Sequence, residues 1–309
     1  MTSMIITIPY QVFYTVIPTI SIIGNSCVVY VTMRSRSLRS PCAILIGLIS
    51  FGDIMHMLGH YVMIVSYNLI EDHLMRQDLC VYWQLIPTLG LFFSSLLLFG
   101  VAVDRLMSTR IVYKFLSTRY YKRYLCAHLF LAVAPSILVE SWIFDERTSD
   151  EYVICDISTP LHAVRLIFVV STMAINTVII LCYVLCFFSI RNIMDENSTK
   201  QVYRSLFVIS TIVLCGWLSG IVVSSTVYFL DLELTLRVHL VSGICVNLAT
   251  ASNFFVYYAI SDKYRGVFDE YLLIRRFKER IKSLTVRSST KVRVTSVNNQ
   301  AQGVHNPRM

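Results

Sequence analysis

The sequence predicts an all-α membrane protein, a seven-transmembrane helix bundle followed by a C-terminal amphipathic helix on the membrane surface. Of its 309 residues, 55% are hydrophobic and 15% are charged, whereas soluble domains average about 45–50% and about 25%. The apolar residues form seven long blocks between short charged clusters. Blocks of this length suit the roughly 20 residues that a helix needs to cross a bilayer.

The seven blocks also predict the domain organisation, because the connections between them are too short for a separate soluble module. We expect a seven-transmembrane domain over residues 1–261, an amphipathic eighth helix over 262–282 and a disordered cytoplasmic tail over 283–309. The predicted spans are Thr7–Met33, Pro41–Leu69, Asp78–Thr109, Lys122–Phe144, Thr159–Arg191, Gln201–Leu230 and Leu236–Ile260.

The basic residues predict the orientation of these spans. If the spans alternate in direction, all but four of the 27 Lys and Arg residues fall on one side, the exceptions being Arg76, Arg147, Arg165 and Arg237. The positive-inside rule then places the N-terminus outside and the C-terminus in the cytoplasm. The net charge of +8 thus reflects topology and attraction to anionic lipid rather than nucleic-acid binding. Met1–Tyr10 contains no Lys or Arg, so we expect no cleaved signal peptide.

The cysteines divide under this topology. Of the nine, only Cys80 and Cys155 face the outside, where an oxidising compartment favours disulfides. We therefore predict one disulfide between them, tying the second outer loop to the third span. The single glycosylation sequon, at residues 197–199, falls in a cytoplasmic loop and is interpreted as a chance match.

The third span connects this cysteine to a charged pair. Arg105 follows Cys80 by 25 residues, with no charge before Asp104, and a helix of that length covers about 38 Å. The pair either anchors the depth of the helix as an interfacial ion pair or acts as a switch. The pattern resembles the third helix of rhodopsin-like G-protein-coupled receptors, in which the arginine belongs to an Asp-Arg-Tyr motif. Here Leu106 takes the tyrosine position.

Asp53 lies in the middle of the second span, where a carboxylate costs about 2.5–3.5 kcal/mol. It is either a protonated or hydrogen-bonded buried residue or the centre of a polar hub. The resemblance implies the hub, with Asn25, Ser94 and Asn253 at the matching positions and a sodium ion as a candidate ligand. Ser94 stands at the family's spacing from the motif arginine.

The resemblance also implies an outer ligand cavity. Amine receptors carry an aspartate where this chain has Pro87, and opsins carry a retinal-binding lysine where it has Asn247. These two ligand classes are therefore disfavoured. His56 and His60 share one helix face, but a pair supplies too few ligands for zinc, so packing or ligand contact is the preferred interpretation. The candidate pocket residues are His56, His60, Trp83, Gln84, Trp217 and His239.

The sixth and seventh spans carry the remaining receptor-like positions. Trp217 fits the toggle tryptophan of the family, or else is a bulky core residue, and Ser219 stands where a proline is usual. Thr199 replaces the acidic residue that often pairs with the motif arginine. On activation, the resemblance implies an outward swing of the sixth helix, with Arg105 reaching toward Tyr183 and Tyr257.

Longer stretches narrow the resemblance. Together, SLRSPCAILIGLISFGD, QDLC, VAVDRL, GWLSG and VNLATASNFFVYYAISDKYR, spread over Gly24 to Phe268, resemble nematode chemoreceptors of serpentine receptor class sx. This implies a plasma-membrane receptor of a sensory neuron, at its cilia, that couples an external small molecule to a heterotrimeric G protein. Receptor kinase and arrestin are further expected partners, at the Ser/Thr-rich tail.

Two other classes of membrane protein were weighed. A seven-helix zinc hydrolase needs at least three ligands at one depth, and His128 lies near the wrong end of its span for that. A small transporter or channel would tend to show inverted repeats and broken helices, neither of which we find. We therefore expect no enzymatic activity, no catalytic residues and no cofactor other than sodium.

Overall fold

The structure is a computed structural model of the whole chain, and it describes residues 6–162, 164–193 and 236–272 together with isolated residues between 207 and 223. Six described helices are long and apolar enough to cross a membrane. The sixth predicted span, 201–230, lies mostly outside the described residues. The six helices are α1 (Ile8–Arg34), α2 (Pro41–Leu69), α3 (Gln77–Ser108), α5 (Tyr121–Asp145), α6 (Arg165–Ile193) and α8 (Leu236–Ile260).

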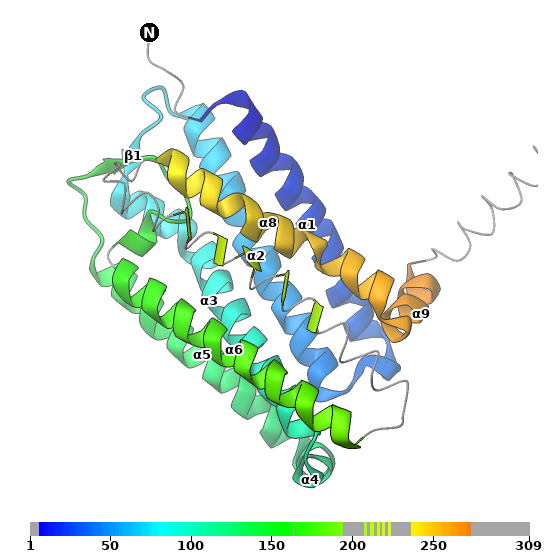
Figure 1. The fold of residues 1–309 in the computed structure, drawn as a ribbon. Coiled ribbons are helices and arrows are strands. Elements are labelled where there is room, and N and C mark those ends of the chain that lie inside the picture. Colours follow the sequence, from blue (N-terminus) through cyan, green and yellow to red (C-terminus); the bar gives the residue numbers. More distant parts are fainter. Residues whose placement is uncertain are drawn as a thin grey trace, which may run out of the picture. The chain divides into compact units, whose positions relative to one another are not determined.

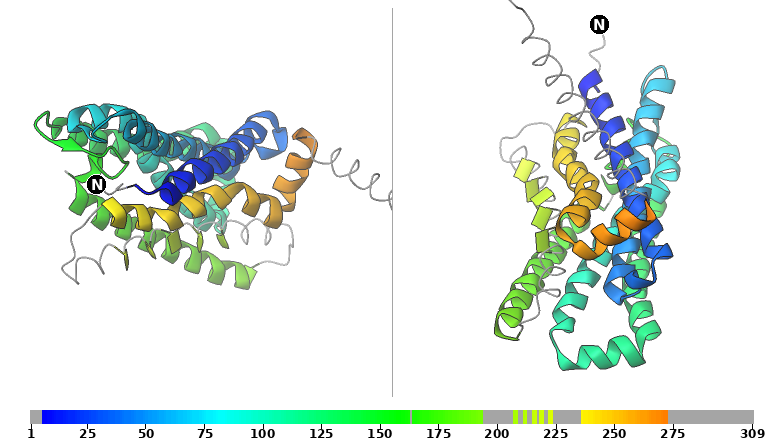
Figure 2. Two further views of the ribbon diagram at one scale, coloured as in Figure 1. Left: turned by 90° about the horizontal axis from the view of Figure 1, so that it is seen from above. Right: turned by 90° about the vertical axis from the view of Figure 1, so that its right-hand side faces the viewer.

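The long helices form one bundle with α3 at its centre (Figure 1). Helix α3 packs against α2, α5 and α6, and α1 packs against both α2 and α8. Seen from above, α1 and α8 lie side by side, as far apart in sequence as two spans can be (Figure 2). The bundle thus brings the predicted second, third, fifth and seventh spans together around one interior.

Local sequence explains where these helices begin. Proline stands in the first turn of both α1 and α2, where its missing N–H removes no helical hydrogen bond. The Ser40 hydroxyl caps α2 by accepting a hydrogen bond from the Ala43 N–H at 3.4 Å. The sequence predicts that the fifth span starts at Thr159, but α6 begins at Arg165. The intervening residues form a short 3-10 helix, η2 (Pro160–His162), preceded by a turn in which the Asp156 carboxylate accepts from the Thr159 N–H.

Two glycines let α2 and α3 approach each other closely. A Cβ added at Gly90 would stand 2.6 Å from the Gly52 carbonyl oxygen, and one at Gly52 would stand 3.1 Å from the Gly90 carbonyl oxygen. The distance at Gly90 is too short for a side chain, and the distance at Gly52 is tight, so glycine at position 90 is what allows this approach of the two backbones.

The connection between α5 and α6, predicted as the second outer loop, is fixed to the start of α3. Strand β1 (Met75–Arg76) pairs antiparallel with β2 (Tyr152–Val153), and Cys80 and Cys155 form a disulfide. Both cysteines are buried, in a cluster with Met75. The predicted disulfide is therefore confirmed, whereas the sequence did not predict the two-residue strands.

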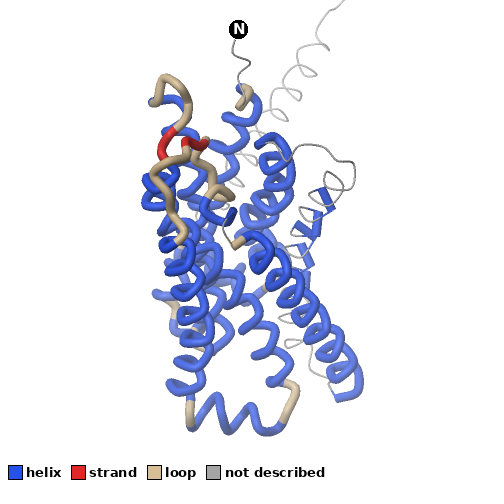
Figure 3. Tube along the Cα trace, turned by 90° about the vertical axis from the view of Figure 1, so that its left-hand side faces the viewer, coloured by secondary structure: helices blue, strands red, loops and turns tan. Residues whose placement is uncertain are grey.

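A short helix that the sequence did not predict, α4 (Ile111–Arg119), lies in the connection between α3 and α5. It stands at the opposite end of the bundle from the β1–β2 pair (Figure 3). This end of α3 carries Asp104 and Arg105, and the other end carries the disulfide of Cys80. The sequence predicted both features at these ends.

The chain divides into two units, residues 1–262 and 263–309. Helix α9 (Asp262–Tyr271) covers the first part of the predicted amphipathic helix. The remainder of that helix and the predicted tail lie outside the described residues.

Candidate functional site

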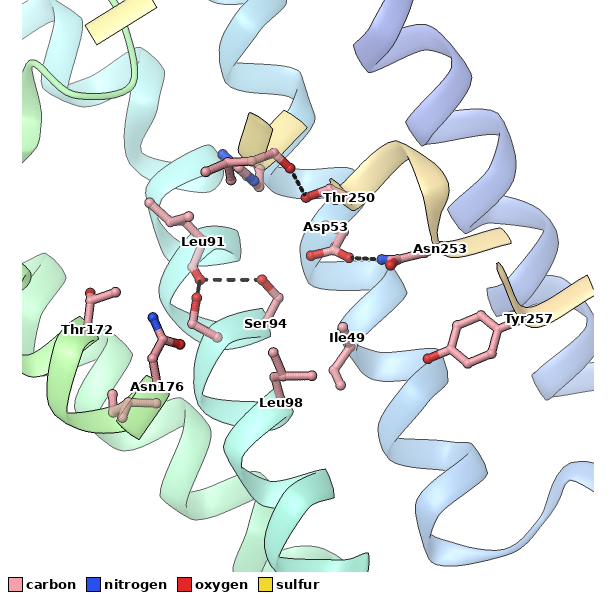
Figure 4. A pocket seen from close by; sticks show the side chains of 14 residues that line it. Ile49, Asp53, Leu91, Ser94, Leu98, Thr172, Asn176, Thr250, Asn253 and Tyr257 are labelled. Atoms are coloured by element: carbon pink, nitrogen blue, oxygen red, sulfur yellow. Dashed lines mark hydrogen bonds between the residues drawn. The ribbon is translucent and has the colours of Figure 1, made fainter. Parts of the chain in front are cut away.

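A polar cavity of about 60 Å³ lies inside the bundle between α2, α3, α6 and α8. Figure 4 shows Asp53, Ser94, Asn176, Asn253 and Tyr257 around it, contributed by four different helices. A cavity of this size can hold ordered water or a small ion. Three of the four predicted hub positions, those of α2, α3 and α8, thus line one space.

Asp53 anchors this cavity. The Asn253 Nδ2 donates to the Asp53 Oδ2 at 3.0 Å, and both side chains are buried. Asn25 reaches α8 one turn away, where its Nδ2 points to the Thr250 carbonyl oxygen at 3.5 Å. The hub therefore joins α2 to α8 directly, and α1 to α8 through Asn25.

The cavity is lined by oxygen atoms of the type that bind hard cations. Asp53 supplies a carboxylate, and the Ser94 and Asn253 side chains supply further oxygen atoms around the same space, the ligand type that hard cations prefer. On α6, Asn176 lines the same cavity, and its buried Nδ2 has no hydrogen-bond partner among the described residues. A buried amide donor of this kind is usually satisfied by water, so we expect an ordered water beside it.

The candidate ligand residues fall into different environments. The His60 Nε2 is 2.8 Å from the Asn247 Oδ1, and its ring packs on Tyr14 at a centroid distance of 4.9 Å. His56 lines the polar cavity, while the Gln84 Nε2 donates to the Gly59 carbonyl oxygen at 3.1 Å.

Trp83 is 60% exposed and is the least buried of the described candidates. Trp217 and the side chain of His239 lie outside the described residues, so the structure says nothing of the toggle.

Asp104 and Arg105, at the end of α3 opposite the disulfide, bind each other. The Asp104 side chain is fully buried, and its Oδ2 accepts from the Arg105 Nε at 2.9 Å and from Nη2. On α6, the Cys186 thiol donates to the Arg105 carbonyl oxygen at 3.7 Å. Tyr183 and Tyr257, the predicted activation partners, are both buried, and Tyr257 lines the polar cavity.

Two tyrosines that the sequence did not single out complete this site. The Asp104 Oδ1 accepts from the Tyr113 hydroxyl of α4 at 3.2 Å and from the Tyr124 hydroxyl of α5 at 3.0 Å. Tyr113 lies in α4, which was not predicted, whereas Tyr124 lies in the first turns of the predicted fourth span. Nothing in the pattern of that span indicated a contact with Asp104.

A third unpredicted contact links α3 to α5. The Thr88 hydroxyl donates to the Glu140 Oε1 at 2.8 Å, and the buried Glu140 Oε2 has no partner among the described residues. The contact joins positions 52 residues apart on two spans, so no local pattern could have indicated it.

The comparison with protein families decides the identity. The sequence model of the serpentine type 7TM GPCR chemoreceptor Srsx family matches residues 18–272. The chain belongs to this family. No curated protein matches the sequence of this Srsx receptor.

Among solved structures, the crystal structure of squid rhodopsin resembles the Srsx receptor with a TM-score of 0.68 and 17% sequence identity, covering 85% of this chain and 84% of that chain. At this identity the similarity concerns the fold, which is a seven-transmembrane helix bundle.

The family assignment bears out the receptor interpretation. The protein is a multi-pass G-protein-coupled receptor, so a heterotrimeric G protein and a small-molecule ligand are its partners. Nothing in the comparisons supports the transporter or channel alternative. Among the described residues, no group of three or more His, Cys, Asp or Glu is placed to hold a metal ion.

Proposed function

We propose that the Srsx receptor lies in the plasma membrane with its N-terminus outside, and that it activates its G protein through Arg105. The observation that carries this proposal is the buried Asp104–Arg105 pair at the end of α3 opposite the disulfide. A disulfide needs an oxidising compartment, and the arginine end is the end rich in Lys and Arg. The two signals agree on which end of α3 faces the cytoplasm.

The ligand enters from the outer side and is a small molecule of the environment. His60 and Gln84 are buried polar groups on the side of the Asp53 cavity that faces the disulfide, and a small-molecule site needs a few polar groups of this kind among apolar ones. Sensory cilia are the expected location. A receptor kinase and arrestin would act on the Ser/Thr-rich residues 283–309. The chain has no role in nucleic-acid binding or catalysis in this proposal.

Two measurements test it. An epitope tag at Met1 should be stained on intact cells, whereas one after Met309 should require permeabilisation. A screen of volatile and water-soluble compounds against cells expressing the receptor, read by calcium and cAMP, should give a response that is absent from untransfected cells. A tag at Met1 that is inaccessible on intact cells would reverse the proposed orientation.

A sodium ion at Asp53 is a further part of the proposal. Sodium bound in the cavity would hold α2, α3 and α8 in the described arrangement, and an ion that binds one state favours it by mass action. Replacing potassium by sodium at constant ionic strength should therefore lower basal nucleotide exchange on the G protein. Asp53→Asn removes the only carboxylate among the described residues that line the cavity, and the variant should lose this sodium response while it still folds.

The control is Asp150→Asn, which changes an exposed acidic residue of the outer loop. This variant should respond to sodium like the unmodified receptor. If Asp53→Asn keeps the full sodium response, Asp53 is a structural buried acid and not an ion ligand.

A further inference from the structure

We propose that the hydroxyl groups of Tyr113 and Tyr124 clamp Asp104 and thereby hold Arg105 in the resting conformation. This inference rests on the proposed role of Arg105 and adds a means of regulation to it. The clamp spans three elements, because Asp104 belongs to α3, Tyr113 to α4 and Tyr124 to α5.

The hydrogen bonds divide between the two oxygens of the Asp104 carboxylate. Its Oδ1 accepts from both tyrosine hydroxyls, at 3.2 Å from Tyr113 and 3.0 Å from Tyr124. Its Oδ2 accepts only from the guanidinium of Arg105 among the hydrogen bonds of the described residues. The tyrosines therefore fix the rotation of the carboxylate so that Oδ2 faces Arg105. Hydrogen bonds to an ionised group are stronger than neutral ones.

Tyr113 also contacts the arginine directly. The Arg105 Nη2 points to the Tyr113 hydroxyl oxygen at 3.4 Å, so this hydroxyl can accept from the arginine while it donates to the aspartate. Burial, and then the Asp104 carboxylate, raise the pKa of Tyr113 above its usual range. The phenol thus remains a donor throughout the physiological pH range.

Packing holds the two rings in place. The Tyr113 and Tyr124 rings meet edge to face at a centroid distance of 6.1 Å, and Tyr124 packs against His128 at 4.5 Å. A Cβ added at Gly100 would stand 3.2 Å from the His128 Cδ2, so α3 leaves room for this stack. Because these contacts involve rings, a phenylalanine at either tyrosine keeps them and removes only the hydroxyl.

Removing the two tyrosine hydroxyls should raise the basal activity of the receptor. Without the hydroxyls, the buried Asp104 carboxylate loses two donors and its fixed orientation, and Arg105 loses one acceptor. Both changes weaken the resting conformation relative to the active one, and a shift in that difference changes the population of the active state. The connection between α3 and α5 therefore supplies a restraint on Arg105. The acidic residue that often pairs with this arginine in similar receptors is Thr199 here, so that restraint is missing.

The test measures basal guanine nucleotide exchange on purified G-protein heterotrimers by the full-length receptor in lipid nanodiscs, at equal receptor concentration. Tyr113→Phe and Tyr124→Phe should each raise basal exchange about threefold to tenfold. The double variant should not exceed Asp104→Asn, because all three act on one carboxylate. Adding Arg105→Ala to Tyr113→Phe should remove the increase, which a merely structural role of the tyrosine would not predict.

Tyr121→Phe is the matched control. It also lies at the start of α5 and also loses one hydrogen bond, from its hydroxyl to the Arg39 carbonyl oxygen at 2.9 Å, but it does not touch Asp104 in the described contacts. Exchange by this variant should equal that of the unmodified receptor. If Asp104→Asn raises exchange while both clamp variants match Tyr121→Phe, the clamp is wrong and the role of Arg105 stands. If Asp104→Asn and Arg105→Ala also leave exchange unchanged, the proposed switch itself has failed.

Discussion

Replacing Arg105 by alanine is expected to reduce G-protein activation by about tenfold or more at matched surface expression. In the proposed switch, the guanidinium leaves Asp104 and reaches the G protein, and alanine removes every one of its donors. Ligand binding should persist, because Arg105 lies at the opposite end of α3 from the disulfide and the outer loop. Asp104→Asn should have the opposite sign and raise basal activation, because it removes the charge that holds the guanidinium.

Arg147→Ala serves as the control, since this arginine lies in the outer loop, packs on Phe144 and donates to its carbonyl oxygen. It should leave activation per receptor unchanged. The competing interpretation is an ion pair that only anchors the depth of α3. That interpretation predicts lower surface expression for both Arg105→Ala and Asp104→Asn, with unchanged activation per receptor, and such a result would refute the switch.

Removing the disulfide should have the largest effect on stability. Cys80→Ser is expected to cost about 2–5 kcal/mol of folding free energy and to lower the amount of receptor at the surface. The bridge closes a loop of 75 residues and holds the β1–β2 pair and its loop against α2 and α3. The Ile157 side chain of that loop reaches Gly59 of α2, with its Cδ1 3.0 Å from where a Cβ would stand.

The double variant Cys80→Ser/Cys155→Ser should be no less stable than either single variant, since one substitution already breaks the bridge. Cys126→Ser, which changes a free and exposed cysteine, should leave thermal stability and expression unchanged. Peptide mass mapping that finds Cys80 and Cys155 as free thiols, or costs that add in the double variant, would contradict the predicted role.

The sequence predicted those features that depend on composition along the chain. The lengths of the apolar blocks located the spans. The positions of the basic residues gave their orientation, and only two cysteines then faced the outside and could pair. Most hydrogen bonds between helices could not be predicted, because one such as that of His60 with Asn247 joins positions 187 residues apart and leaves no local pattern. The resemblance to known receptors supplied the hub, and three of its residues do line one cavity.

The clamp around Asp104 shows a different limit. Tyr113 belongs to a nine-residue helix that is too short and too polar to stand out from a loop. Its contact with Asp104 depends on how the connection between α3 and α5 folds back toward α3. Tertiary packing determines that path, and local helix preference does not.

The paired glycines of α2 and α3 have a mechanical consequence. With the Gly52 carbonyl 2.6 Å from where a Cβ of residue 90 would stand, the backbones interlock, and sliding one helix along the other would drive neighbouring side chains into this gap. Close-packed interfaces of this kind resist gradual deformation. We therefore expect α2 and α3 to move as one rigid unit that carries both Asp53 and Arg105, so that rearrangement on activation takes place in the helices that pack against this unit.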